Sequence, residues 1–178
     1  NVSVDFKKNI QRSRDISNRL SKGIEFLMKK NKITHITGIG KLTSKTSLEV
    51  KNKQKTDTIE ADKIILATGA RPRSFPGMEF DGNRVISFKE AMILDSPPKK
   101  MIIIGSGAIG SEFAYYYNEF GTEVHMIEML DRILPIEDAD VSKEVEKSFK
   151  KSSIKISTGT KVSKIESLKT KVKVHTER

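Results

Sequence analysis

A glycine-rich motif of the form G-x-G-x-x-G contains the residues of this sequence best suited to bind a ligand. The motif consists of Gly105, Ser106, Gly107, Ala108, Ile109 and Gly110. The first glycine permits a tight turn out of a strand, the second lets a pyrophosphate approach the backbone, and the third lets a helix pack closely on a sheet. Because the free N–H groups at the start of that helix would face the phosphates, the motif predicts a dinucleotide site.

An acidic residue at the end of the next strand is the second half of this fingerprint. Glu128 lies 18 residues after Gly110 and directly follows residues 124–127 (VHMI). A carboxylate at this place accepts hydrogen bonds from the adenosine ribose and repels a 2′-phosphate. The spacing therefore predicts NAD rather than NADP, although Arg132 in the following loop could weaken the preference.

The apolar pattern around the motif predicts the elements that must position these residues. Strands are expected at 101–104, 123–128 and 154–156, and helices from the motif to Phe120 and at 138–151. Gly121 ends the first of these helices. The order strand, helix, strand, helix, strand predicts a parallel α/β sheet, followed by further strand candidates at 161–165 and 169–175.

Both helices have an apolar face that is expected to pack on this sheet. The positions concerned are Ile109, Phe113, Tyr117 and Phe120 in the first helix and Val141, Val145 and Phe149 in the second. Three tyrosines in a row, residues 115–117, must point in different directions, and Tyr117 is expected in the core.

The first 98 residues predict a long helix, a small antiparallel meander and a connector. The helix begins at Asp5, which can cap it, and ends near Lys30. Strand candidates follow at 33–36, 47–50 and 58–61, with the apolar run 64–67 as a buried strand. Prolines and glycines between residues 71 and 98 indicate a connector with one short helix at 87–94.

The composition excludes several classes of protein. The chain has no cysteine, which excludes disulphides, zinc–thiolate sites, iron–sulphur clusters and a thiol nucleophile on these 178 residues. The longest apolar runs, such as residues 101–104, are far shorter than the roughly 20 residues of a membrane helix, which excludes an integral membrane protein. We expect a cytoplasmic location. Of the net charge of +10, residues 1–97 contribute 19 basic and 11 acidic side chains. The lysines among these basic residues are not interleaved with aromatic side chains, as they would be in a nucleic-acid groove. They therefore indicate a solvated surface.

Glu112 and the three histidines are the other side chains that could take part in chemistry. Glu112, two residues after the motif, is placed in the first turn of the helix, where the helix dipole favours an acid. The histidines, His35, His125 and His175, have no mutual spacing that suggests a metal site or a base–nucleophile pair.

Several segments resemble the flavin-dependent pyridine nucleotide–disulphide oxidoreductases. They are residues 64–72 (IILATGARP), 105–112 (GSGAIGSE) and 124–128 (VHMIE). Further similarity to the members that oxidise dihydrolipoamide is found in residues 35–42 (HITGIGKL), 133–135 (ILP) and 138–141 (DADV). The resemblance covers the chain from about residue 5 to the end and implies FAD and NAD as cofactors.

The resemblance implies a role for each matching residue on the NAD side. Residues 105–110 would hold the pyrophosphate of NAD, and Glu128 would hold its ribose. Val162 would lie against the adenine, and Glu112 would lie near the nicotinamide, where relatives pair this acid with a lysine beside the flavin.

On the FAD side the resemblance implies fewer contacts. Gly40 would lie near the adenine end of FAD, and the turn formed by Thr68, Gly69 and Ala70 would also contact it. Ala70 stands where many members have serine. The implied fold is therefore α/β, with the Rossmann-like parallel sheet of an NAD-binding domain and the second half of a FAD-binding domain with a small β-meander, both truncated. The expected boundaries are 1–72 for the FAD part, 73–98 for the connector and 99–178 for the NAD part.

The sequence also departs from the family pattern. Members begin with their own G-x-G-x-x-G motif for FAD and a pair of redox cysteines, and they end with an interface domain that carries a histidine–glutamate pair acting across the dimer. Because none of these is found here, we expect an internal fragment that has no catalytic residues and is inactive alone. The parent would be a homodimer that acts on the lipoyl domains of 2-oxo-acid dehydrogenase complexes.

Two alternatives remain open on the sequence. The chain could come from another flavoprotein of the family, similar to the NADH oxidases, mercuric reductases or glutathione reductases. It could instead be a non-catalytic dinucleotide-binding module whose lysine-rich first half binds an acidic partner, a case in which salt would weaken binding and no flavin would be present.

Overall fold

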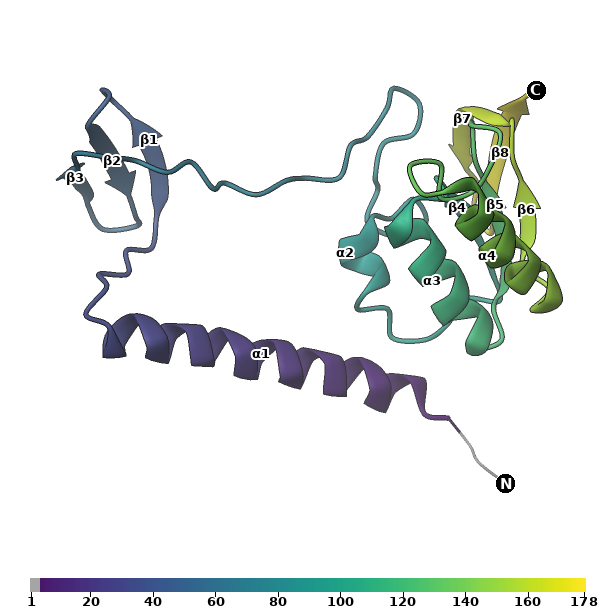
Figure 1. Ribbon diagram of the computed structural model, residues 1–178, viewed down its shortest axis with the longest axis horizontal. Helices are drawn as coiled ribbons and strands as arrows, with labels where there is room; N and C mark the ends of the chain where they lie inside the picture. The colour runs from purple at the N-terminus through teal and green to yellow at the C-terminus, as the bar shows by residue number, and fades with distance from the viewer. Residues whose placement is uncertain (1–3) are drawn as a thin grey trace. The chain divides into compact units, whose positions relative to one another are not determined.

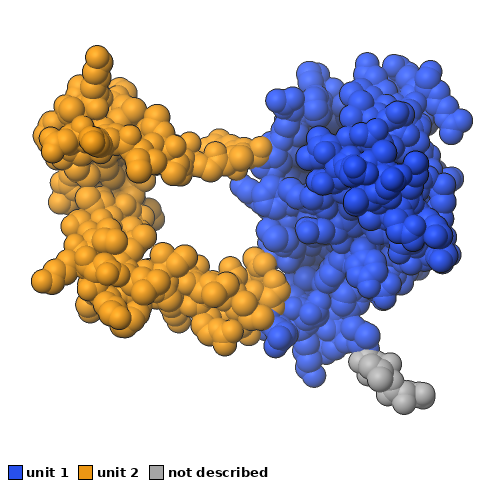
Figure 2. Space-filling view, in the orientation of Figure 1, with its two compact units in different colours: residues 1–12, 72–178 blue, residues 13–71 orange. Residues whose placement is uncertain are grey.

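A computed structural model describes residues 4–178, which form two compact units (Figure 2). The first unit contains the residues up to Arg12 together with Pro72–Arg178, and the second is Ser13–Arg71. Each unit has sheets of its own. Among the described helices, none combines the length and the apolar content that crossing a bilayer requires.

A parallel sheet of three strands lies at the centre of the first unit (Figure 1). Its order is β4 (Lys100–Ile104), β5 (Glu123–Ile127) and β6 (Lys155–Ser157). The helix α3 (Ala108–Glu119) connects β4 to β5, and α4 (Ala139–Lys151) connects β5 to β6. The predicted α/β class with a parallel sheet is confirmed.

Short local signals set the ends of these helices, and the stop at Gly121 is the one that the sequence predicted. The Oδ1 atom of Asp138 accepts a hydrogen bond from the backbone N–H of Asp140 at 2.9 Å and so caps the start of α4. Gly121 follows α3 with a φ of +83°, a conformation that favours glycine. In the connector, Ser87 and Glu90 form a capping box on the short helix α2 (Phe88–Ala91).

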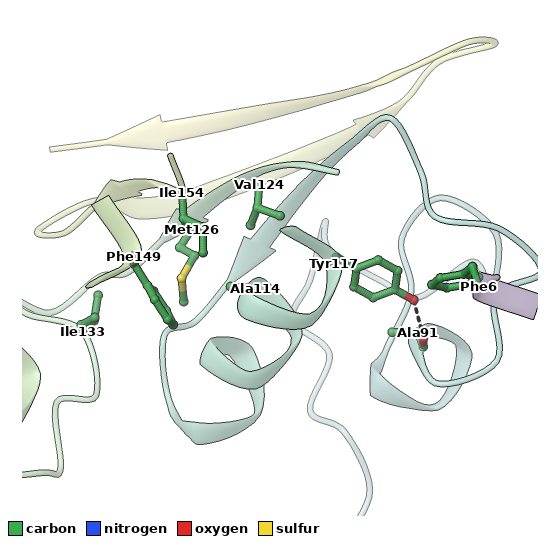
Figure 3. Close-up of a cluster of buried hydrophobic side chains, with 9 residues drawn as sticks. All are labelled: Phe6, Ala91, Ala114, Tyr117, Val124, Met126, Ile133, Phe149 and Ile154. Carbon is green, nitrogen blue, oxygen red and sulfur yellow. Dashed lines mark hydrogen bonds between the residues drawn. The ribbon is translucent and has the colours of Figure 1, made fainter. Parts of the chain in front are cut away.

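The core of the first unit lies between the sheet and its helices (Figure 3). Its buried members are Phe6, Ala91, Ala114, Tyr117, Val124, Met126, Ile133, Phe149 and Ile154. On the strand β4, Met101 and Ile103 pack against this core, whereas Ile102 and Ile104, which alternate with them, are 40% and 47% exposed. Tyr117 is fully buried, as predicted.

The predicted apolar faces of the helices are wrong at two positions. Ile109 is 57% exposed because the buried stripe of α3 runs through Ser111, Ala114 and Tyr117 and leaves Ile109 outside it. In α4, Val141 is 50% exposed and its neighbour Ser142 is buried instead. A serine fits there because its hydroxyl donates to backbone carbonyls nearby.

A separate hairpin follows the parallel sheet. The strands β7 (Lys161–Ser167) and β8 (Val172–Glu177) pair antiparallel, with an irregularity between Val162 and Lys164. Both strand candidates at the end of the sequence are thus confirmed as strands. The connector reaches this hairpin, since the N–H of Ile165 donates to the carbonyl of Gly77 at 2.9 Å.

The start of the long helix α1 (Phe6–Lys30) belongs to the first unit. The ring of Phe6 meets the ring of Phe120 edge-on, with centroids 4.9 Å apart, and the amide of Asn9 donates to the hydroxyl of Tyr116 at 2.9 Å. Asp5 Oδ1 accepts from a backbone N–H in the first turn, so the predicted helix and its cap are both confirmed.

The second unit contains the predicted antiparallel meander. Its strands are β1 (Ile39–Leu42), β2 (Ser47–Lys51) and β3 (Thr56–Glu60), in the order β1-β2-β3. The prediction of a strand at 33–36 is wrong. The backbone there completes the end of α1 instead: Lys32 has a φ of +57°, and the N–H of Ile33 donates to the carbonyl of Met28 at 2.9 Å.

The apolar run 64–67, predicted as a buried strand, has no regular secondary structure. Ile65 is 89% exposed and Leu66 is 68% exposed. A strand needs a neighbour to take up its backbone N–H and C=O groups, and no strand of the described chain pairs with this run.

Replacing Phe6 should destabilise the first unit. We expect Phe6→Ala to lower the free energy of unfolding by about 3 kcal/mol, because the ring is 8% exposed and packs in an aromatic cluster. Chemical denaturation measures the change. Phe26→Ala is the matched control on the same helix, since Phe26 is 64% exposed; an equal loss in both variants would contradict the packing role.

Alkaline pH should weaken the same core through Tyr117. Burial and the neighbouring Tyr116 raise the pKa of Tyr117 to about 12, and its hydroxyl donates to the carbonyl of Ala91. The unfolded chain releases this proton near pH 10 and the folded protein does not, so stability falls as the pH rises from 10 towards 12, by at most about 3 kcal/mol. Denaturation of wild type and Tyr117→Phe over this range should show a difference that shrinks with pH; a constant difference would refute the assignment.

Candidate functional site

The glycine-rich turn joins the end of β4 to the start of α3. Gly105 has a φ of +95° and donates its N–H to the carbonyl of Ile127 at 2.9 Å, which connects the turn to the neighbouring strand β5. Gly107 is the N-cap of α3, in an extended conformation. All six motif residues therefore lie where a strand ends and a helix begins, as the fingerprint requires.

Gly110 is the position where a side chain cannot be tolerated. A Cβ added there would lie 2.1 Å from the carbonyl oxygen of Gly105 and 3.3 Å from the Cγ2 of Ile103. The first atom belongs to the backbone of the turn and cannot move without breaking it. The helix thus approaches the strand as closely as the motif predicts.

Gly107 has the opposite surroundings. A Cβ added there would meet no atom within 4 Å, so the space beside it is open. No side chain caps α3 at this point, and the first N–H groups of a helix have no partner within the helix. The open space and the free donors together can accommodate an anionic group such as a phosphate.

Glu128 follows the end of β5 and is held inside the protein, with 9% of its surface exposed. Its Oε2 atom accepts hydrogen bonds from the backbone N–H of Ser106 at 2.8 Å and from the Ser106 hydroxyl at 2.9 Å. Its Oε1 atom accepts from the N–H of Leu130 at 3.0 Å. The motif and the acid predicted from its spacing are therefore in direct contact.

These hydrogen bonds keep the carboxylate charged. Burial by itself would raise the pKa of Glu128, but the donors of Leu130 and Ser106 together lower the pKa below its ordinary value. The site consequently presents an anion at the end of β5, which can accept hydroxyl hydrogen bonds and repels a second negative group nearby.

Ser106 is a residue whose importance the motif did not indicate. It is fully buried, and its carbonyl accepts from the N–H of Leu134 at 2.9 Å and from the hydroxyl of Ser111 at 3.1 Å. The motif treats this position as variable. Only the spacing between the motif and Glu128 could have indicated that the two positions meet.

The loop after Glu128 returns to the motif. Leu134 has a φ of +46°, an unusual conformation for a bulky residue, and its hydrogen bond to Ser106 holds it there. Its carbonyl accepts from the hydroxyl of Ser142 at the start of α4. The side chain of Arg132 donates to the carbonyl of Pro135 in its own loop, at 3.0 Å.

Val162, expected beside the adenine, lies near this group through its neighbours. The N–H of Thr160 donates to the carbonyl of Glu128 at 2.9 Å, and the N–H of Gly159 donates to the carbonyl of Leu130 at 2.7 Å. Val162 itself is 7% exposed and is the second residue of β7, the first strand of the hairpin. The structure thus brings the segment before β7 next to Glu128.

Glu112 lies in the second turn of α3 and not in the first, because the helix begins at Ala108, within the motif. Glu112 is exposed, one turn away from the open space beside Gly107. The placement of this acid by the helix dipole is therefore wrong, since that effect is confined to the first turn.

The residues expected to contact FAD lie in the second unit. Gly40 lies in β1 opposite Val50, and a Cβ there would lie 3.1 Å from the side chain of Leu48. Thr68 and the two residues after it lie in the irregular segment beyond β3 and are exposed. These residues form no enclosed site within the unit.

Alanine substitutions should distinguish Gly110, which is needed for close packing, from Gly107, which lies beside open space. We expect Gly110→Ala to lower the free energy of unfolding by about 3 kcal/mol, because its Cβ meets backbone. Gly107→Ala should lower it by only about 1 kcal/mol, since the space is open and the remaining cost is that alanine is a poorer N-cap than glycine. Denaturation of both variants tests this, and similar losses would contradict the geometry.

Comparison with protein families identifies one match along almost the whole chain. Residues 2–178 match the family model described as pyridine nucleotide-disulphide oxidoreductase. Among curated proteins, the dihydrolipoyl dehydrogenase of Zymomonas mobilis is 44% identical over 155 residues, which are 86% of this chain and 33% of the relative. That of Bacillus subtilis is 40% identical over 170 residues, which are 90% of this chain and 36% of the relative.

Solved structures give the same result. LpdA from Mycobacterium tuberculosis matches 98% of this chain with a TM-score of 0.91 and 26% identity. The HOCl-induced flavoprotein disulfide reductase RclA from Escherichia coli matches 98% with a TM-score of 0.83 and 28% identity. The chain spans 40% of either structure and about a third of the length of the two curated relatives.

Proposed function

Because the chain belongs to the pyridine nucleotide–disulphide oxidoreductase family, we propose that it forms part of a dihydrolipoyl dehydrogenase that oxidises dihydrolipoamide to lipoamide and reduces NAD. The observation that carries this proposal is the buried carboxylate of Glu128, hydrogen-bonded to Ser106 within the glycine-rich turn. The names of the curated relatives at about 40% identity support the choice of reaction.

The described residues fit a dinucleotide. The pyrophosphate would lie beside Gly107, where no atom blocks it and the N–H groups of α3 point outwards. The adenosine ribose would donate a hydroxyl to Glu128, and Val162 would lie against the adenine. When bound, NAD supplies the acceptor for a hydride. Glu112 would lie on the nicotinamide side, one helical turn beyond the pyrophosphate.

The proposed preference for NAD over NADP comes from the negative charge of Glu128. A 2′-phosphate at the ribose would approach the ionised carboxylate of Glu128, and like charges at short range repel strongly where burial limits screening. Arg132 is the cation that could offset this repulsion. Its hydrogen bond to the carbonyl of Pro135 directs the guanidinium towards its own loop.

The proposed contribution to FAD binding is smaller. Residues 1–72 would be the C-terminal part of a FAD-binding domain, 73–98 a connector and 99–178 the N-terminal part of the NAD-binding domain. Gly40 would approach FAD near its adenine end, and Thr68, Gly69 and Ala70 would form a turn against it; when bound, FAD passes electrons between thiols and NAD.

The thiol chemistry would come from other parts of the parent protein. Disulphide exchange needs thiolates, and this chain has no cysteine, so we propose that residues 1–178 are inactive alone. The proposed parent is a cytoplasmic homodimer whose substrate is the lipoyl domain of a 2-oxo-acid dehydrogenase complex.

A second candidate reaction within the family has one observation in its favour. RclA, a flavoprotein disulfide reductase by its title, matches the chain at 28% identity, slightly above the 26% of LpdA. The curated dehydrogenases are 44% and 40% identical, and this larger similarity favours dihydrolipoamide as the substrate.

The experiment is steady-state kinetics of the full-length protein with dihydrolipoamide as the electron donor and either NAD or NADP as the acceptor. We expect turnover with NAD, and we expect Glu128→Ala to lower kcat/KM for NAD by roughly 10-fold to 100-fold, since a hydrogen bond to a charged group is lost. The change for NADP should be much smaller, because the repulsion disappears together with the acceptor.

Glu123→Ala is the matched control, because Glu123 is an exposed acid at the other end of β5 that pairs with Lys100. It should leave both values unchanged. An equal loss for NAD and NADP in Glu128→Ala would contradict the ribose role. Turnover of a different dithiol or disulphide substrate, with none of dihydrolipoamide, would keep the family assignment and contradict the proposed reaction.

A further inference from the structure

We propose that Ser106 is a positioning residue of the ribose site, whose hydroxyl fixes the carboxylate of Glu128 so that Oε1 is the atom left to accept a ribose hydroxyl. The inference rests on the proposed NAD function and adds the residue that sets its geometry. It assigns a task to the variable second position of the glycine-rich motif.

Both acceptor sites of the Oε2 atom of Glu128 are occupied. An ionised carboxylate has about four acceptor sites, two on each oxygen. The backbone N–H and the hydroxyl of Ser106 occupy both sites of Oε2, at 2.8 Å and 2.9 Å. This oxygen has no capacity left for a ligand.

The Oε1 atom of Glu128 has an acceptor site that remains free. It accepts a hydrogen bond from the N–H of Leu130 at 3.0 Å; the backbone of Met129 also favours the charged carboxylate but makes no hydrogen bond as short as this one, so Oε1 keeps one acceptor site. The donors on the two oxygens lie on different segments, the turn after β4 and the turn after β5. Rotation of the carboxylate would break hydrogen bonds at both, so the free site keeps a fixed direction.

Ser106 is itself held in place by hydrogen bonds to its carbonyl. Its carbonyl accepts from the N–H of Leu134 and from the hydroxyl of Ser111, at 2.9 Å and 3.1 Å. The residue has no exposed surface, so water cannot replace its hydroxyl. A hydroxyl fixed in this way preorganises its acceptor before the nucleotide arrives, which reduces the entropy lost on binding.

Without the hydroxyl, one acceptor site of Oε2 becomes free inside the protein. The backbone N–H of Ser106 is then the one remaining hydrogen bond of Oε2, so the carboxylate is held less firmly in its orientation. The ribose hydroxyl would no longer meet a single prepared acceptor. The consequence is weaker binding of NAD at an unchanged pyrophosphate site.

The test is a double-mutant cycle on the full-length protein, with calorimetry of NAD and NADP binding to wild type, Ser106→Ala, Glu128→Ala and the double variant. We expect Ser106→Ala to weaken NAD binding by roughly threefold to tenfold, as for the loss of one hydrogen bond. NADP binding should change less. In the Glu128→Ala background the serine substitution should have no further effect, because it acts through the carboxylate.

Thr122→Val is the matched control. The Thr122 hydroxyl is also buried and donates to a backbone carbonyl, that of Pro98, but Thr122 precedes β5 whereas Glu128 follows it, so the ratio of NAD to NADP affinity should stay at the wild-type value. Ser106→Gly, which also removes the hydroxyl, repeats the measurement if the alanine variant does not fold.

Three results would overturn the inference: no change in Ser106→Ala, the same loss in the presence and absence of the Glu128 carboxylate, or an equal change of the ratio in Thr122→Val. The proposed function fails differently. If Glu128→Ala alone leaves NAD binding unchanged, the acid does not hold the ribose and the NAD site itself is misassigned.

Discussion

The carboxylate of Glu128 is a charge held inside the protein, and the arrangement of the glycine-rich turn depends on the hydrogen bonds that stabilise this charge. A buried carboxylate without donors is costly, so the donors must be in place whenever the unit is folded. They come from Ser106 after β4 and from Leu130 after β5. One side chain thereby sets the relative position of two strand ends, and the loop that returns through Leu134 is fixed to the same serine.

The helix α3 is held in a different way at each end. At its start the missing Cβ of Gly110 allows direct contact with the carbonyl of Gly105, so the N–H groups of the helix reach the open space of the turn. Near its other end, Tyr116 and Phe120 pack on Phe6 of α1. A helix fixed at both ends cannot move away from the turn, which explains why an open position such as Gly107 can remain part of an ordered site.

The sequence predicted the parts that local chemistry decides. The cap at Asp5, the helix stop at Gly121 and the acid at Glu128 follow from residue type and spacing, and the structure confirms the placement of each. The contacts of Ser106 and the left-handed conformation of Leu134 were not predictable, because each depends on a partner more than twenty residues away. The proposed roles towards the nucleotide remain predictions.

The two units differ in how much of their order comes from their own contacts. In the first unit, the side chains of Val124 and Met126 are almost fully buried under its own helices. In the described part of the second unit, Val50 is the one buried hydrophobic side chain, and Ile65 and Leu66 are exposed. An apolar run indicates that a strand will be buried and does not say which strand will cover it. The residues proposed to hold NAD are therefore positioned by contacts within their unit, whereas Thr68 and its neighbours need contacts that Ser13–Arg71 does not provide.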